Sequence, residues 1–232
     1  MARRRPRHRG VSKEEWLLSQ QQQLDGWSDI ATLDTQRRRL HDNYFELIHS
    51  LLPPLDESSE IVEIGSGPVC FSQEIAVGHK TFVDPLLDDL RRLYPGAMPK
   101  DAVYLNTPAE EIPLPSHCID VVICMNTLSF SENPEEVLYE VARLLKSDGV
   151  LLLAVQISSS LMARAHYFGC RVFPLLRSYT RPYRFDYQAM YHTVSRHLHV
   201  DESRSLAKPH PLNLFGDHEY LFICSPMSAE QR

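Results

Sequence analysis

The sequence lacks any long apolar run. A helix that crosses a bilayer needs about 20 apolar residues, whereas the longest apolar stretch runs only from Val150 to Val155. The arginine-rich start is followed by Val-Ser-Lys-Glu-Glu-Trp at 11–16, which is not the apolar segment of a secretory signal peptide. We therefore expect no membrane partner and a cytoplasmic location.

Paired cysteines are missing as well. The five cysteines are scattered and odd in number. They lack the Cys-x-x-Cys spacing that is typical of zinc and redox sites. We expect reduced thiols, most of them buried. His197 and His199 stand close together, but no cysteine or carboxylate accompanies them at metal-site spacing. No metal site is predicted.

An excess of positive charge is also absent. The formal net charge is −6, although arginine occupies positions 3, 4, 5, 7 and 9. The remainder of the chain is therefore acidic, which disfavours a globally basic surface for nucleic acid. Residues 1–10 are predicted to be a disordered basic tail exposed to solvent, with a nucleic-acid or membrane contact as the alternative.

What is present suits a single core, because 232 residues with 43% hydrophobic side chains are typical of one soluble domain. Ser12 and Glu15 have the spacing of a capping box, which predicts a helix over 12–23. A second helix is predicted over 32–52, where apolar residues share one face up to Pro53. Together, residues 11–55 are predicted to form a helical lid in front of a core at 56–226.

From residue 60 onward, short apolar segments alternate with amphipathic ones, which predicts an α/β fold with helices on both faces of a mainly parallel sheet. Strands are predicted at 60–64, 80–83, 102–105, 119–125, 149–156, 199–204 and 218–224. Helices are predicted at 86–94, 134–145 and 187–198, and Asp148-Gly149 is expected to turn into the fifth strand. The arginine- and aromatic-rich stretch at about 157–186 is predicted to be an inserted cap.

A glycine-rich turn follows the first predicted strand. Glu63 ends that strand and Gly65-Ser-Gly67 follows, where glycines let the backbone approach a ligand and leave helix-terminal amides free to bind polar groups. Dinucleotide sites begin with the similar pattern G-x-G-x-x-G, but the third position here is Cys70. A carboxylate beside the turn suits a cationic amino-acid moiety better than a pyrophosphate.

Asp84 ends the next predicted strand, 19 residues after Gly65. A carboxylate at this place can accept hydrogen bonds from both ribose hydroxyls. The same spacing occurs in dinucleotide folds, so Asp84 predicts a nucleoside ligand without identifying it.

Four consecutive segments over about 60–156 together resemble the class I S-adenosylmethionine-dependent methyltransferases, in particular those of methyltransferase type 11. They are the glycine turn, the strand ending at Asp84-Pro85, the segment Ala109-Glu-Glu-Ile-Pro-Leu-Pro115 followed by strand 118–128, and the helix and strand at 133–152. The resemblance implies a Rossmann-like seven-stranded sheet and S-adenosylmethionine (SAM) as the cofactor. It implies that the cofactor is bound by Glu63, Gly65, Gly67, Asp84, Pro85, Ala109, Glu110 and Asn126.

Two positions depart from the family pattern. Many relatives carry an aspartate just before the alanine beside the adenine, where this chain has Pro108; backbone groups or Glu110 would hold the adenine instead. A frequent histidine pair after the fourth strand is replaced by Ser129-Phe130. No general base can be assigned there, although methyl transfer from a sulfonium needs alignment and desolvation more than acid–base help.

The acceptor is predicted to be a small molecule, anionic or aromatic, because the cap combines arginines with aromatic residues. Candidates for catalysis are His41 and Tyr44 on the second helix and His166 in the cap. Two alternatives stay open. One is an RNA or protein methyltransferase, and the other is a catalytically silent, SAM-binding regulatory protein.

Overall fold

The computed structural model describes residues 10–159, 182–206 and 218–228. They contain a seven-stranded sheet with the order β3-β2-β1-β4-β5-β7-β6. Strand β7 is antiparallel to both of its neighbours, and the other pairs are parallel. The strands are β1 (Glu60–Ile64), β2 (His79–Val83), β3 (Val103–Leu105), β4 (Ile119–Met125), β5 (Leu145–Ile157), β6 (Leu198–Ser205) and β7 (His218–Pro226). The predicted Rossmann-like, mainly parallel seven-stranded sheet is confirmed.

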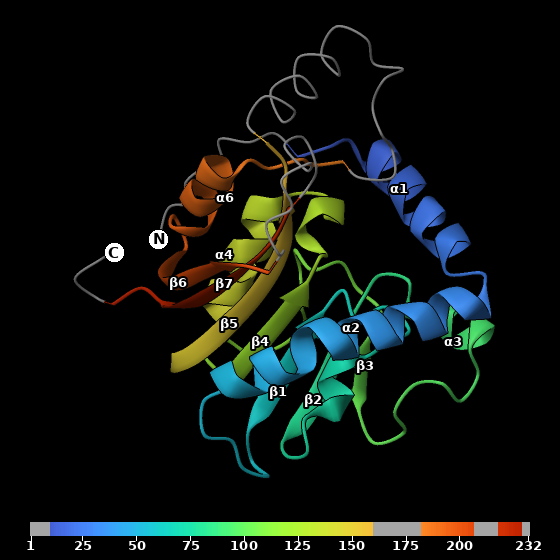
Figure 1. Cartoon of the computed structure of the whole chain (residues 1–232), viewed down its shortest axis with the longest axis horizontal. Helices are drawn as coiled ribbons and strands as arrows, with labels where there is room; N and C mark the ends of the chain where they lie inside the picture. Colours follow the sequence, from blue (N-terminus) through green and yellow to red (C-terminus); the bar gives the residue numbers. More distant parts are fainter. Residues whose placement is uncertain (1–9, 160–181, 207–217, 229–232) are drawn as a thin grey trace, which may run out of the picture.

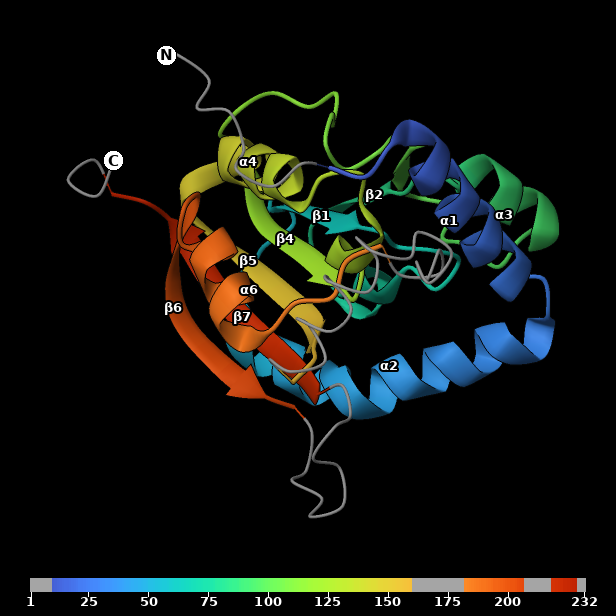
Figure 2. The same cartoon turned by 90° about the horizontal axis from the view of Figure 1, so that it is seen from above.

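Helices cover both faces of this sheet (Figures 1 and 2). The helices are α1 (Lys13–Gly26), α2 (Ile30–Leu51), α3 (Leu87–Leu93), α4 (Pro134–Leu144) and α6 (Tyr187–Val194), with short 3-10 turns η1 (Phe71–Glu74) and η2 (Leu128–Phe130). Helix α2 lies on one face, and α4 and α6 lie on the other. In the part of the chain that the structure describes, no helix is long and apolar enough to span a membrane.

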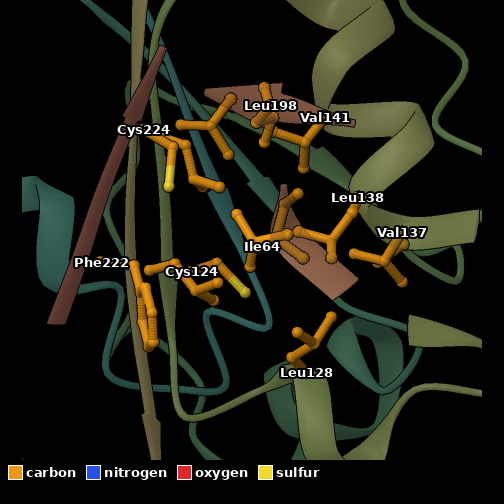
Figure 3. Packing of buried hydrophobic residues seen from close by; sticks show 14 of the residues in the cluster. Ile64, Cys124, Leu128, Val137, Leu138, Val141, Leu198, Phe222 and Cys224 are labelled. Atoms are coloured by element: carbon orange, nitrogen blue, oxygen red, sulfur yellow. The ribbon is translucent and has the colours of Figure 1, made fainter. Parts of the chain in front are cut away.

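The two cores follow from the alternation of side chains along each strand. Ile61 and Ile123 point to the face where Tyr44 and Ile48 of α2 are fully buried. Ile64 and Cys124 point to the opposite face, where they meet a row of apolar residues from α4 (Figure 3). This row comprises Val137, Leu138 and Val141. Helix α2 is thus a covering layer of the sheet.

Helices α1 and α4 begin directly after the capping residues that the sequence predicts, Ser12 and Asn133. Ser12 Oγ accepts a bond from Glu15 N at 3.2 Å, and Glu15 Oε2 accepts one from Ser12 N at 3.1 Å, so the predicted capping box is confirmed. Asn133 caps α4 through a 3.1 Å bond from Glu135 N. Both caps satisfy amides that have no partner within the helix.

One predicted turn is wrong, because Asp148 and Gly149 lie inside β5. The register between β4 and β5 shifts there, and β5 carries the extra residues. A Cβ on Gly149 would lie 2.9 Å from the carbonyl oxygen of Ile119, so glycine permits the close approach of the two strands. The strand therefore begins directly after α4.

Two predicted segments lie mostly outside the described residues. Of the basic tail, only Gly10 is described, and it lies against the backbone of Glu132. Of the cap at 157–186, residues 160–181 are outside the description, including His166. The cap's last residues return to the core, where Ser158 N donates to Phe185 O at 2.8 Å.

Candidate functional site

A pocket of about 300 Å³ opens beside the carboxyl ends of β1, β2 and β4. The chain runs from β1 outward to β2 and β3 and then crosses to β4 on the other side of β1. Such a reversal of strand order leaves a crevice, where open α/β sheets bind their ligands. The pocket is lined by all eight predicted cofactor residues: Glu63, Gly65, Gly67, Asp84, Pro85, Ala109, Glu110 and Asn126.

The turn after β1 requires glycine because of both its backbone conformation and its close packing. Gly65 and Gly67 have φ angles of +69° and +52°, in the left-handed region that glycine adopts without strain. A Cβ on Gly65 would also lie 2.0 Å from Thr127 Oγ1 and 2.5 Å from Thr127 Cβ. Because Thr127 follows β4, the close packing of the turn against it joins the two sides of the crevice.

Asp84 is buried at the end of β2, and two backbone amides fix its carboxylate. Oδ2 accepts a bond from Gly67 N at 3.0 Å, and Oδ1 accepts one from Leu86 N at 2.9 Å. Burial raises the pKa of Asp84, while the two amide bonds lower it. A carboxylate has about four acceptor positions, so two remain for the hydroxyl groups of a ligand.

Glu63 is fixed in a similar way, and this corrects one expectation. Its Oε1 accepts a bond from Phe71 N at 3.0 Å, and its Oε2 accepts one from Ser72 N at 2.7 Å. The turn therefore leads only to the short η1, whose first amides are occupied by Glu63 and not free for a ligand. Burial raises the pKa of Glu63 to about 7, against the lowering effect of these amide bonds.

The segment after β3 contributes Pro108, Ala109 and Glu110 to the pocket. Glu110 Oε1 accepts a 2.9 Å bond from Asn133 N, which ties this segment to the start of α4. Burial raises the pKa of Glu110. One of its oxygens is thus occupied within the protein, and Pro108 offers only backbone to a ligand.

The other side of the pocket was missed by the sequence analysis. It is lined by α1 with its capping residue, by α2 and by β5, through Trp16, Gln20, Gln23, Trp27, Gln36, Arg39 and Gln156. Both tryptophans of the chain belong to this group. Gln20 Nε2 donates to Phe130 O at 3.0 Å, which holds α1 against the loop after β4. Because α1 is polar and has no apolar stripe, its docking has no periodic signal in the sequence.

The catalytic candidates occupy different places. His41 is exposed, pairs with Asp42 at 3.4 Å and does not line this pocket. Tyr44 is 1% exposed and lies at 3.4 Å from Asn126 Nδ2. Burial and a hydrogen bond to Glu219 raise its pKa, so its hydroxyl stays protonated and cannot serve as a general base near neutral pH.

Comparison with known proteins identifies the core. The family model described as "Methyltransferase domain" matches residues 62–153, which include the glycine turn, Asp84 and Asn126. Residues 62–153 therefore match a methyltransferase domain, in agreement with the resemblance drawn from the sequence. None of the curated proteins matches the sequence.

Solved structures share the fold of this methyltransferase domain. A SAM-dependent methyltransferase from Thermotoga maritima is 18% identical, with a TM-score of 0.59 over 92% of this chain and 100% of that one. Geranyl diphosphate C-methyltransferase from Streptomyces coelicolor is 8% identical, with a TM-score of 0.62 over 85% and 83%. A chain from the complex of the Haloferax volcanii Trm112 methyltransferase activator with a methyltransferase is 19% identical, with a TM-score of 0.60 over 88% and 98%.

The pocket has an uneven distribution of charge. Its three lining carboxylates, Glu63, Asp84 and Glu110, all lie on the side of β1, β2 and β3. Among the described lining residues, Arg39 is the one cation. Within the described ranges, no cluster of three or more histidine, cysteine, aspartate or glutamate residues is arranged to hold a metal ion.

Proposed function

We propose that this methyltransferase binds SAM through the acidic side of the pocket and transfers the methyl group to a small molecule on the other side. The single observation that carries the proposal is the placement of three carboxylates, the buried Glu63 and Asp84 and the half-buried Glu110, along the path predicted for the cofactor. SAM carries a sulfonium and an ammonium, so an acidic wall complements it. The small-molecule acceptor agrees with the Streptomyces enzyme of the same fold, which was crystallised with geranyl diphosphate.

Methyl transfer from a sulfonium depends mainly on how the protein aligns the donor and the acceptor. A lone pair on the acceptor attacks the methyl carbon, the carbon–sulfur bond breaks, and its electron pair stays on sulfur. Asp84 would fix the ribose, and Asn126 at the end of β4 would lie beside the reacting methyl group. Trp16 and Trp27 would exclude water from the pocket, which strengthens electrostatic interactions inside it.

Calorimetry on the full chain with S-adenosylhomocysteine (SAH) tests the proposal. We expect saturable binding with a dissociation constant in the micromolar range, accompanied by a change in tryptophan fluorescence, because both tryptophans line the pocket. Absence of binding at millimolar SAH would refute the proposed function. Tight binding of SAM without turnover over a broad panel of small acceptors would instead favour the silent regulatory protein.

We expect the affinity for SAH to depend on pH because of Glu63. Its pKa is raised to about 7, so its carboxyl is mostly protonated at pH 6 and mostly ionised at pH 8. The ionised form attracts the ammonium group of SAH, and the affinity for SAH should therefore rise with pH by up to about tenfold across this range and then level off. Calorimetry at each pH measures the effect.

Two controls accompany this titration. The exposed Glu74 lies in η1, the 3-10 turn whose amides bind Glu63, and Glu74→Gln should leave the pH profile of SAH binding unchanged. 5′-Methylthioadenosine lacks the ammonium-bearing part of SAH, and its affinity should vary little with pH. An SAH affinity that is flat between pH 6 and 8, or that falls, would contradict the role of Glu63.

A further inference from the structure

The side of the pocket opposite the carboxylates has its own chemistry. Amide side chains and indole rings line it, together with the guanidinium of Arg39. No carboxylate among the described residues lines this side. A ligand group bound here would therefore meet neutral donors and one positive charge.

Glu219 lies next to Arg39 but is held by other partners. Its carboxylate accepts a hydrogen bond from Asn126 Nδ2 and a second one from the hydroxyl of Tyr44. Tyr44 is buried in the core between α2 and the sheet, and Asn126 has a left-handed φ of +56°. The position of the Glu219 carboxylate is therefore fixed by neighbours that belong to the rigid part of the fold.

Arg39 is left with unused donors. Its Nη2 lies 3.9 Å from Glu219 Oε2, which is an ion-pair distance and too long for a hydrogen bond. In residues 10–159, 182–206 and 218–228, the side chain of Arg39 makes no hydrogen bond. Its side chain is 46% exposed, whereas that of Glu219 is 14% exposed. The guanidinium, with five N–H groups, is thus oriented by Glu219 and open to the pocket.

We propose that Arg39 binds a carboxylate or phosphate group of the ligand at this end of the pocket, beside the carboxylate of Glu219. A guanidinium binds either anion through two parallel N–H bonds. The inference rests on the proposed function, because the anion belongs either to the methionine part of the cofactor or to the acceptor. Glu219 also competes with that anion for the charge of Arg39, so its own charge limits the affinity.

The test compares wild type with Arg39→Gln by calorimetry, using two pairs of probes. SAH is compared with 5′-methylthioadenosine, which lacks the carboxylate. 4-Hydroxybenzoate is compared with the neutral 4-hydroxybenzamide on SAH-saturated protein. If the cofactor supplies the anion, Arg39→Gln should weaken SAH at least fivefold and leave 5′-methylthioadenosine unchanged. If the acceptor supplies the anion, the affinity of Arg39→Gln for SAH should equal that of wild type. The variant should then no longer bind 4-hydroxybenzoate more tightly than 4-hydroxybenzamide.

Two further variants separate the effect of charge at this site from simple loss of structure. Glu219→Gln removes the competing charge and should strengthen binding of the same anionic probe about two- to fivefold, whereas structural damage would weaken every probe. Arg38→Gln changes the neighbouring residue, which lies outside the pocket lining, and should change no affinity.

The inference is overturned if Arg39→Gln leaves SAH unchanged and wild type shows no preference for 4-hydroxybenzoate over its amide. It is also overturned if Glu219→Gln weakens the anionic and the neutral probe alike. Failure of wild type to bind SAH at all would refute the proposed function itself. Normal SAH binding without any Arg39 effect would refute only the anion site.

Discussion

Gly65→Ala should abolish SAH binding and destabilise the fold by about 3 kcal/mol or more. The left-handed backbone costs a residue with a Cβ about 1–2 kcal/mol, and overpacking a tight site adds about 1–3 kcal/mol. Rotation of the Thr127 side chain cannot relieve the contact, because the new Cβ would lie 2.5 Å from the Thr127 Cβ as well as 2.0 Å from its Oγ1. The turn after β1 or the backbone at Thr127 after β4 must therefore move. Thermal unfolding and SAH calorimetry measure the two effects.

Gly96→Ala is the matched control for this substitution. Gly96 has a φ of +83°, but nothing lies within 4 Å of the Cβ that alanine would add. It should show only the conformational cost, about 1–2 kcal/mol, and should bind SAH like wild type. Equal stability losses in the two variants would mean that the contact with Thr127 has no energetic weight. Wild-type SAH affinity in Gly65→Ala would exclude the turn from the binding site.

Asp84→Asn should lower the affinity for SAH by between about ten- and a hundredfold. The substitution removes a charged acceptor from ribose hydroxyl groups, and hydrogen bonds to charged groups contribute about 1.5–3 kcal/mol. It also turns an amide N–H₂ group toward Gly67 N or Leu86 N, both of which now donate to Asp84. Calorimetry with SAH measures the loss, and thermal unfolding shows that the variant is folded.

The control for Asp84 is Asp88→Asn, the same chemical change on the exposed first turn of α3. It should leave SAH affinity within about twofold of wild type, since Asp88 does not line the pocket and its exposed charge is screened by salt. If adenosine, which keeps both ribose hydroxyls, binds Asp84→Asn as well as wild type, Asp84 does not hold the ribose.

Local patterns predicted most of the sheet and one side of the pocket. Strand β1 was placed at its observed residues, 60–64, because an apolar run between turn signals is strong local information. Glu63 lies near the end of β1, and Asp84 and Asn126 directly follow β2 and β4, so all three are at the same edge of a parallel sheet. Their convergence in one pocket follows from the topology alone.

The rest of the pocket depends on contacts that no local pattern encodes. Trp16 and Gln20 reach it only because α1 docks on the loop after β4, through a side-chain bond to Phe130 O. Glu219 meets Asn126 although 93 positions separate them in the sequence. The use of Glu63 to bind the amides of η1 also depended on tertiary packing, because a carboxylate beside a glycine turn suits an internal amide as well as a ligand.

A crystal structure of the full chain with SAH bound would test the central claim most directly. We predict that the ribose hydroxyls lie within hydrogen-bond distance of the Asp84 carboxylate, with the adenine beside Ala109 and Glu110. The sulfur should face Asn126 and the side of the pocket that Trp16 and Gln156 line. SAH bound elsewhere, or with its ribose away from Asp84, would contradict the assignment of this pocket to the methyl donor.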